Sequence, residues 1–75
     1  MKLRKLTSDE IEKLASRKGV KRIAVENFLS TVTNNSDSYF ARLNLGRDAA
    51  LYDWNHETVQ AIEDGIRMAE TNGPE

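Results

Sequence analysis

Apolar residues recur at helical spacing along most of the chain, and no segment alternates with the two-residue period of a strand. In residues 8–17, Ile11, Leu14 and Ala15 share one side of a helix while the charged side chains occupy the other. A second run, residues 21–32, is amphipathic in the same way, with apolar positions at Ala24, Val25, Phe28, Leu29 and Val32. The pattern therefore predicts an all-α fold that begins with two amphipathic helices.

The second half of the chain predicts two or three more helices. We expect a helix over residues 37–45, with Tyr39, Phe40 and Leu43 facing inward and Gly46 ending it. A short helix over residues 47–52 follows in this prediction, and a last helix spans residues 56–70. The buried side of the last helix is expected to carry Val59, Ile62, Ile66 and Ala69, and Asn72-Gly73-Pro74 is expected to end it. The whole chain is then a compact bundle of four to five short helices.

Local signals place the helix boundaries. Thr7 and Glu10 are spaced as a capping box, in which the Thr7 hydroxyl accepts a free backbone N–H and Glu10 reaches back to the cap. Gly19 adopts a left-handed conformation without steric penalty, so we expect it to end the first helix. Further caps are expected at Asn35 or Ser36 and at Asn55.

Length and composition narrow the possibilities. Seventy-five residues suffice for a single domain, with a two-helix unit at about 8–32, a helical remainder at about 36–70 and a short tail at 71–75. The absence of cysteine excludes disulfides, thiolate catalysis and zinc sites built on sulfur. No segment approaches the roughly 18 apolar residues of a membrane span, and the start of the chain lacks the apolar region of a secretory signal. We therefore expect a cytoplasmic protein that does not enter membranes.

Charge is distributed unevenly along the chain. The segment from Met1 to Val25 carries eight basic and three acidic side chains, whereas the segment from Glu26 to Glu75 carries three basic and nine acidic ones. The overall charge of -1 thus hides a basic start and an acidic remainder. A molecule polarised in this way can offer a positive surface to a polyanion while its acidic side stays in solvent.

The segment from Leu14 to Leu29 carries a recognisable spacing. Ala15 stands where two helices cross closely, and Gly19 follows four residues later in the turn. Val20, Val25 and Phe28 then occupy the apolar positions that hold a second helix against the first. This pattern, within residues 11–29, resembles the helix-turn-helix of bacterial repressor-type DNA-binding proteins. Lys18 departs from it, because that position is commonly small or apolar.

The resemblance implies a recognition helix, about residues 21–32, that docks in the major groove of double-stranded DNA. It implies a small regulatory or nucleoid-associated protein, with a homodimer as one expected form because a single unit contacts few base pairs. Arg22 and Asn27 have the chemistry to read guanine and adenine, although Glu26 is placed to pair with Arg22 one turn earlier. The other expected contacts, to phosphates or the minor groove, are Lys2, Arg4, Lys5, Arg17, Lys18 and Lys21.

An interaction module is the alternative function. The acidic stretch from Asp48 to Glu70, interleaved with aromatic residues, has the composition of a surface that docks a basic or apolar protein partner. The aromatic side chains themselves are expected mainly in the core, namely Tyr39, Phe40, Tyr52 and Trp54. A purely structural or dimerisation role is a third possibility.

Catalytic chemistry is not expected. His56 is the sole histidine, and it falls in the first turn of a predicted helix without a fixed catalytic partner. The chain has no Gly-rich phosphate loop, no Ser-His-Asp spacing and no cluster of metal-ligating residues. We therefore expect no enzyme activity, no cofactor, no metal and no small-molecule substrate.

The sequence also matches itself when Ile11 is aligned with Leu45. In this internal alignment Ile11, Ala15, Val20, Ala24, Val25, Phe28 and Val32 fall on Leu45, Ala49, Trp54, Thr58, Val59, Ile62 and Ile66. The mismatches set Leu14, Gly19 and Leu29 against Asp48, Asp53 and Glu63. A tandem pair of helix-turn-helix units is one interpretation, and two unrelated amphipathic halves are the other.

Overall fold

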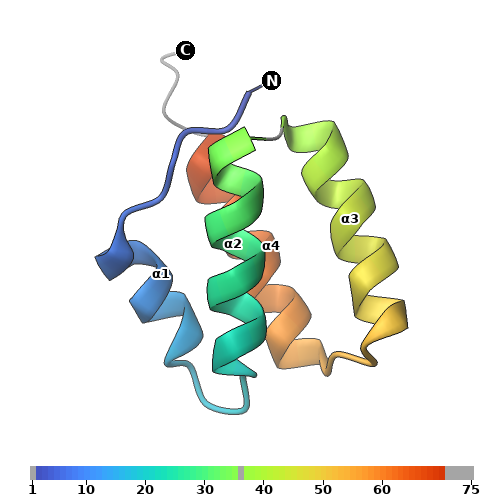
Figure 1. Ribbon diagram of the computed structural model, residues 1–75. Coiled ribbons are helices and arrows are strands. Elements are labelled where there is room, and N and C mark those ends of the chain that lie inside the picture. The colour runs from blue at the N-terminus through green and yellow to red at the C-terminus, as the bar shows by residue number, and fades with distance from the viewer. Residues whose placement is uncertain (1, 36, 71–75) are drawn as a thin grey trace.

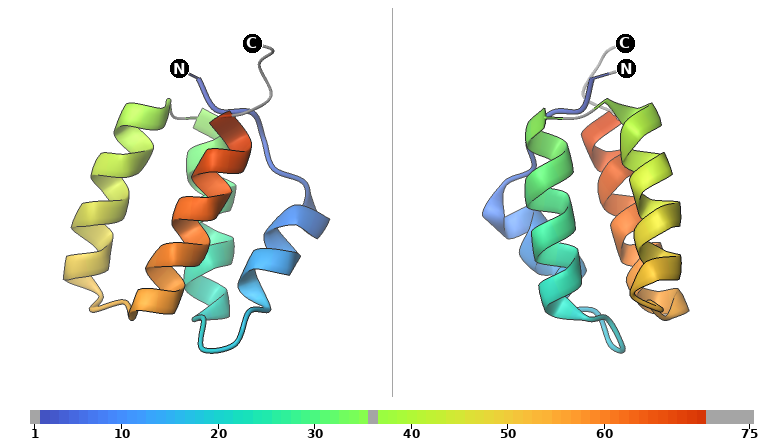
Figure 2. Two further views of the ribbon diagram at one scale, coloured as in Figure 1. Left: turned by 180° about the vertical axis from the view of Figure 1, so that it is seen from behind. Right: turned by 45° about the vertical axis from the view of Figure 1, so that its right-hand side comes forward.

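Four α-helices make up the described part of the chain, residues 2–35 and 37–70, in the computed structural model (Figure 1). They are α1 (Ser8–Ala15), α2 (Arg22–Asn35), α3 (Ser38–Leu51) and α4 (His56–Glu70). Helices α2 and α4 lie against each other at the centre, with α1 on one side and α3 on the other (Figures 1 and 2). The predicted all-α bundle is confirmed, with the lower of the two expected helix numbers. The expected tail at 71–75, and Ser36, lie outside the described residues.

Helices α1, α2 and α4 bury the sides that their sequence periodicity predicts. The core includes Leu14, Ala15, Val25, Phe28, Leu29, Val32, Ile62, Ile66 and Ala69, with Ile11 and Val59 partly buried against it. Sequence patterning did not identify Thr58, Ala61 and Gly65, which are also buried on α4. Small residues there let α4 lie close to its neighbours, since a Cβ on Gly65 would come within 2.6 Å of a Leu29 methyl carbon.

The predicted start of α1 is confirmed in detail. The Thr7 side chain accepts a hydrogen bond from the backbone N–H of Glu10 at 3.1 Å, and the Thr7 N–H donates to the Glu10 carboxylate at 2.9 Å. Gly19 has φ +82° and lies in the turn between α1 and α2, as expected, but it does not end the first helix: α1 ends at Ala15 with Ser16 as its C-cap.

Helix α3 contradicts the predicted break at Gly46. The two predicted helices, 37–45 and 47–52, are one continuous helix with Gly46 in its interior. A glycine inside a helix costs only about 1 kcal/mol relative to alanine, which packing of the flanking turns against α4 offsets. The helix begins at a cap that was not predicted: the Asp37 carboxylate accepts the Phe40 N–H at 3.0 Å.

The inward side of α3 was also predicted wrongly. Tyr39, Phe40 and Leu43 are 68%, 57% and 52% exposed, while Ala41 and Leu45 are the residues that face the core. Apolar residues occur on two sides of α3, so helical periodicity alone cannot select which side packs. Tyr52, expected in the core, is exposed as well, and Trp54 is only partly buried.

An N-terminal segment, residues 2–7, closes one end of the bundle. Leu3 and Leu6 are buried in the core. The Arg4 N–H donates to the Ala69 carbonyl at the end of α4, and the Leu6 N–H donates to the Thr33 hydroxyl near the end of α2. The segment therefore ties the C-terminal ends of the two central helices together.

The positions of the helices agree in part with the internal alignment that places Ile11 on Leu45. Under that alignment α2 coincides with 56–69 of α4, and Gly19 falls on Asp53, the other residue with positive φ (+55°) among those described. The two halves nevertheless pack differently. Helix α1 packs on both α2 and α4, whereas α3 packs on α4 and makes no comparable contact with α2.

Candidate functional site

The residues predicted to contact nucleic acid form two clusters at opposite ends of α2. One cluster holds Lys2, Arg4 and Lys5 of the N-terminal segment, and the other holds Arg17, Lys18, Lys21 and Arg22. Because α2 has 14 residues and a helix rises 1.5 Å per residue, about 20 Å separates the clusters. Asn27 belongs to α2 between them. The predicted residues thus surround one helix but do not form one continuous patch.

The arginines of both clusters are engaged by acidic side chains. Arg22 donates twice to Glu12, at 2.6 and 2.7 Å, and once to Glu26 at 3.0 Å. The hydrogen bond from Arg22 lowers the pKa of the Glu12 carboxyl from its ordinary value. Arg4 pairs with Glu10 and Arg17 with Asp64. A phosphate or a base must compete with these carboxylates for each guanidinium group.

The lysines differ from the arginines in this respect. Within the described residues, none of the five lysines forms an ion pair. Lys18 and Lys21 are exposed at the N-terminal end of α2. Their ammonium groups are the basic charges in this region that a ligand meets without displacing a protein carboxylate.

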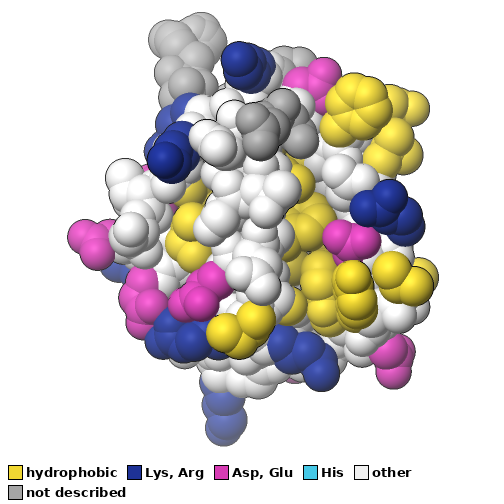
Figure 3. Space-filling view, viewed as in Figure 1, with side chains coloured by type: hydrophobic (Ala, Val, Ile, Leu, Met, Phe, Trp, Pro, Cys, Tyr) yellow, Lys and Arg dark blue, Asp and Glu magenta, His cyan; other side chains and the backbone are white. Residues whose placement is uncertain are grey.

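The outward side of α2 is uncharged over most of its length. It carries Ile23, Asn27, Ser30, Thr31 and Asn34, and neither α1 nor the C-terminal half covers it. In Figure 3 this side is a white ridge down the middle of the molecule, with basic side chains toward both of its ends. The ridge is accessible to a ligand, but its centre supplies amide and hydroxyl groups and no charge.

A groove runs beside that ridge, between α2 and α3. Its volume is about 660 Å³, within the range of ligand-binding pockets. Its lining residues are Lys21, Ile23, Ala24, Asn27, Phe28, Thr31, Val32, Asn44, Arg47, Asp48, Tyr52 and Trp54. Figure 3 shows hydrophobic side chains gathered along it and over the adjoining surface of α3. The groove exists because α3 stands away from α2, in contrast with the close packing of α1.

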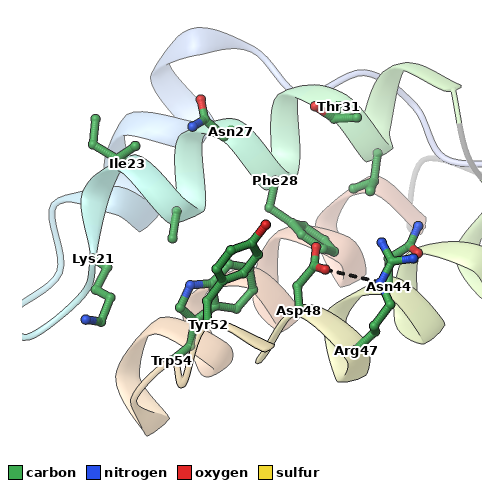
Figure 4. A pocket seen from close by; sticks show the side chains of 12 residues that line it. Lys21, Ile23, Asn27, Phe28, Thr31, Asn44, Arg47, Asp48, Tyr52 and Trp54 are labelled. Carbon is green, nitrogen blue, oxygen red and sulfur yellow. Dashed lines mark hydrogen bonds and ion pairs between the residues drawn. The ribbon is translucent and has the colours of Figure 1, made fainter. Parts of the chain in front are cut away.

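Three aromatic rings form the floor and one end of the groove (Figure 4). Phe28 meets Trp54 edge to face, with ring centroids 6.0 Å apart, and Tyr52 stacks on Trp54 at 5.8 Å. Tyr52 is 61% exposed, so this cluster is open to solvent on the groove side. The fold already holds the three rings in place, so a ligand that packs on them loses little free energy to ordering their side chains.

Only three charged residues line the groove, and two of them neutralise each other. Arg47 lies 3.3 Å from the Asp48 carboxylate, as the dashed line in Figure 4 shows. Lys21 remains at the mouth without an ion pair among the described residues. The groove therefore combines an apolar floor with a single uncompensated positive charge.

Sequence reasoning missed this groove. The outward apolar residues of α3, Tyr39, Phe40 and Leu43, do not line it, and the residues that α3 does contribute are polar or charged, so the pattern of α3 gave no signal for it. The residues of the groove come from α2, α3 and the turn before α4, so no local spacing connects them. Their proximity is a tertiary property.

Residues 2–35 and 37–70 contain neither a cluster of metal-ligating side chains nor a helix that could span a membrane. Within these residues, no group of three or more His, Cys, Asp or Glu side chains converges on one point. No helix there is both long and apolar enough to cross a bilayer.

Comparisons with known proteins found nothing similar: no family model, no curated protein and no solved structure matches the chain. A functional assignment must therefore come from the surfaces just described.

Proposed function

We propose that this protein is an interaction module that binds the apolar side of an amphipathic helix from a partner protein in the groove between α2 and α3. The observation that carries the proposal is the aromatic cluster of the groove, in which Tyr52 and the partly buried Trp54 are open to solvent and the buried Phe28 packs against Trp54. A concave, largely apolar lining with a few polar groups at its edge is typical of binding sites.

The shape of the groove favours a helical ligand. The lining runs from Lys21 to Val32 along α2, about 17 Å at 1.5 Å per residue, and from Asn44 to Asp48 on α3, so the groove accommodates about three turns of a further helix. Such a ligand would pack between α2 and α3 through residues spaced i, i+3, i+4 and i+7, the usual mode of helix-in-groove recognition. It would also pack against α2 more extensively than α3 does.

The charge at the mouth favours an acidic ligand. Arg47 and Asp48 satisfy each other, so Lys21 is the lining charge left to a partner. A carboxylate that flanks the apolar side of the ligand would pair with Lys21, whereas a basic flank would be repelled. Binding, and no catalysis, is the activity that these groups support.

Selection from a phage-displayed library of helical peptides, about 16 residues long, tests the proposal. Enriched peptides should share an apolar helical stripe and a flanking acidic residue. Their affinity, measured by fluorescence anisotropy, should fall at least about tenfold for Ile23→Glu, because Ile23 lines the groove and is 65% exposed. Lys21→Glu should weaken the same peptides.

Ser30→Glu is the matched control. It places the same charge on the exposed side of α2, outside the lining of the groove, and should leave peptide affinity unchanged. Failure to enrich any peptide, or equal affinity for Ile23→Glu and the unmodified protein, would overturn the proposal.

DNA binding is the second candidate function. It is supported by Lys18 and Lys21, which form no ion pair among the described residues, and by the uncovered side of α2 that presents Asn27. The carboxylates on Arg22 count against it, since the residue expected to read guanine is already occupied.

A salt titration with duplex DNA tests this candidate. Binding through several phosphates should weaken steeply between about 50 and 200 mM salt. The double substitution Lys18→Ala and Lys21→Ala should reduce it at low salt, while Lys13→Ala, an exposed lysine on α1, should not. Absence of binding at low salt would eliminate this function.

A further inference from the structure

A second apolar surface lies on the side of α3 that faces away from the rest of the molecule. Its large residues are Tyr39, Phe40, Leu43 and Leu51, which are 52–68% exposed, and the smaller Gly46 and Ala50 are also exposed on this helix. Figure 3 shows hydrophobic side chains over the α3 side of the molecule, beyond the groove. We refer to these six residues as the outer face of α3.

Gly46 has no explanation within the monomer. A Cβ added there would meet no atom within 4 Å, so alanine fits without any shift. Glycine in a helix interior is nevertheless less stable than alanine. Gly65 offers the contrast, because a Cβ there would collide with Leu29. A glycine that the chain itself does not require, on an exposed apolar helix side, is the residue that permits close approach of another backbone.

The outer face is complementary to itself. At 100° per residue, Tyr39, Leu43, Gly46 and Ala50 fall in one narrow stripe along α3. If a second copy lies antiparallel, with a two-fold axis near residues 44 and 45, Tyr39 faces Ala50 of that copy. Leu43 then faces Gly46 of the copy. In both pairings a large residue opposes a small one, and the two-fold axis repeats each pairing. A second copy of the chain therefore has the shape needed to pack along this stripe.

Charge does not oppose this pairing. The two arginines that border the stripe already have acidic partners in their own chain, Arg42 with Glu70 at 3.1 Å and Arg47 with Asp48 at 3.3 Å. No acidic residue belongs to the outer face. Each arginine therefore keeps a carboxylate of its own chain beside it when two copies meet.

The area available suits a weak dimer. Aromatic side chains present about 150–250 Å² each, and the exposed parts of the outer face amount to about 500 Å² per copy. Two copies would bury at most about 1,000 Å² in total, which is the size of a weak, transient interface and below that of a stable one. We propose that the second copy of this chain is the occupant of the outer face of α3, in a reversible antiparallel α3–α3 homodimer that leaves the groove open.

Sedimentation equilibrium of the whole chain, from about 5 to about 500 μM, measures this association. The average mass should rise with concentration from that of one chain to that of two. Leu43→Glu should lower the association constant at least about tenfold, because it buries a charge close to the two-fold axis. Ser30→Glu, on α2, should dimerise like the unmodified protein.

Gly46→Leu distinguishes specific packing of the two helices from non-specific hydrophobic association. The substitution adds apolar surface at a position with free space in the monomer, so non-specific association would increase. Close packing of α3 against its copy instead predicts at least about tenfold weaker dimerisation, since the larger side chain would hold the two helices apart. Circular dichroism should show an unchanged helical fold in both variants.

Two results would overturn the proposal. One is a single-chain mass at every concentration, and the other is association by Gly46→Leu as strong as that of the unmodified protein. Dimerisation and peptide binding fail independently, because Leu43→Glu alters the outer face and Ile23→Glu alters the groove.

Discussion

Glu10 illustrates how much one side chain does in this small domain. Its carboxylate accepts two hydrogen bonds from the Arg4 guanidinium, at 2.8 and 3.0 Å, and one from the Thr7 N–H. These donors, Arg4 foremost, hold the pKa of Glu10 at about 2, below its ordinary value of 4.5. The residue thereby joins the capping box of α1 to the N-terminal segment.

This pKa makes a prediction about acid stability. Because the folded pKa lies below the unfolded value, the contribution of Glu10 is fully present above pH 4.5 and is lost as the pH falls toward 2. Urea unfolding at pH 7 and at about pH 2.5 should show a loss of stability on acidification that is smaller in Glu10→Gln. An identical loss in both proteins would show that the carboxylate is not linked to folding.

At the scale of the element, α3 is the exceptional helix. Helices α1, α2 and α4 each bury one side, whereas α3 presents apolar residues both to α4 and to solvent. The groove and the outer face both depend on this helix. One apolar side of α3 packs on α4 and the other is open to solvent, and both proposed interactions depend on this placement of the helix.

Two glycines on neighbouring helices should respond in opposite directions to the same substitution. Gly46→Ala should raise the free energy of unfolding by about 1 kcal/mol, measured in the monomeric Leu43→Glu background, because the helix gains propensity and nothing clashes. Gly65→Ala should lower it by about 1–3 kcal/mol, because the new methyl group overlaps the buried Leu29. Urea titrations give both values, and equal effects at the two sites would contradict the packing described for α4.

For the molecule as a whole, the N-terminal segment completes a small core. A domain of this size buries a limited fraction of its surface, so each buried side chain carries a large share of its stability. Leu3 and Leu6 enter the core beside the ends of α2 and α4, which are far apart in the sequence. The segment that was expected to be a basic arm thus has a structural role through its leucines.

Truncation of one of these leucines tests that role. Leu6→Ala should reduce the free energy of unfolding by about 2–5 kcal/mol, the usual cost of a large cavity in a core. The neighbouring Lys5→Ala, at an exposed position, should change it by less than about 0.5 kcal/mol. Similar effects of the two substitutions would mean that the segment does not pack in solution.

Most local features were predictable, with the break expected at Gly46 and the missed Asp37 cap as exceptions, whereas residues brought together from afar were not. The capping box, the turn at Gly19 and the pair of Arg22 with Glu26 each involve partners within a few positions, and each was anticipated. The pairs of Arg17 with Asp64 and of Arg22 with Glu12 span 47 and 10 positions and were not. These long-range pairs decide which predicted basic residues remain available to a ligand.

The sequence by itself determined the helical class, the boundaries of the last helix and the buried sides of three helices, because hydrogen bonding and amphipathic period act within a few residues. Tertiary structure alone decided which side of α3 packs, where the N-terminal leucines go and that a groove opens beside α2. A helix with apolar residues on two sides satisfies either orientation locally. The choice between them is made by the surfaces of α2 and α4, which meet it only in the folded chain.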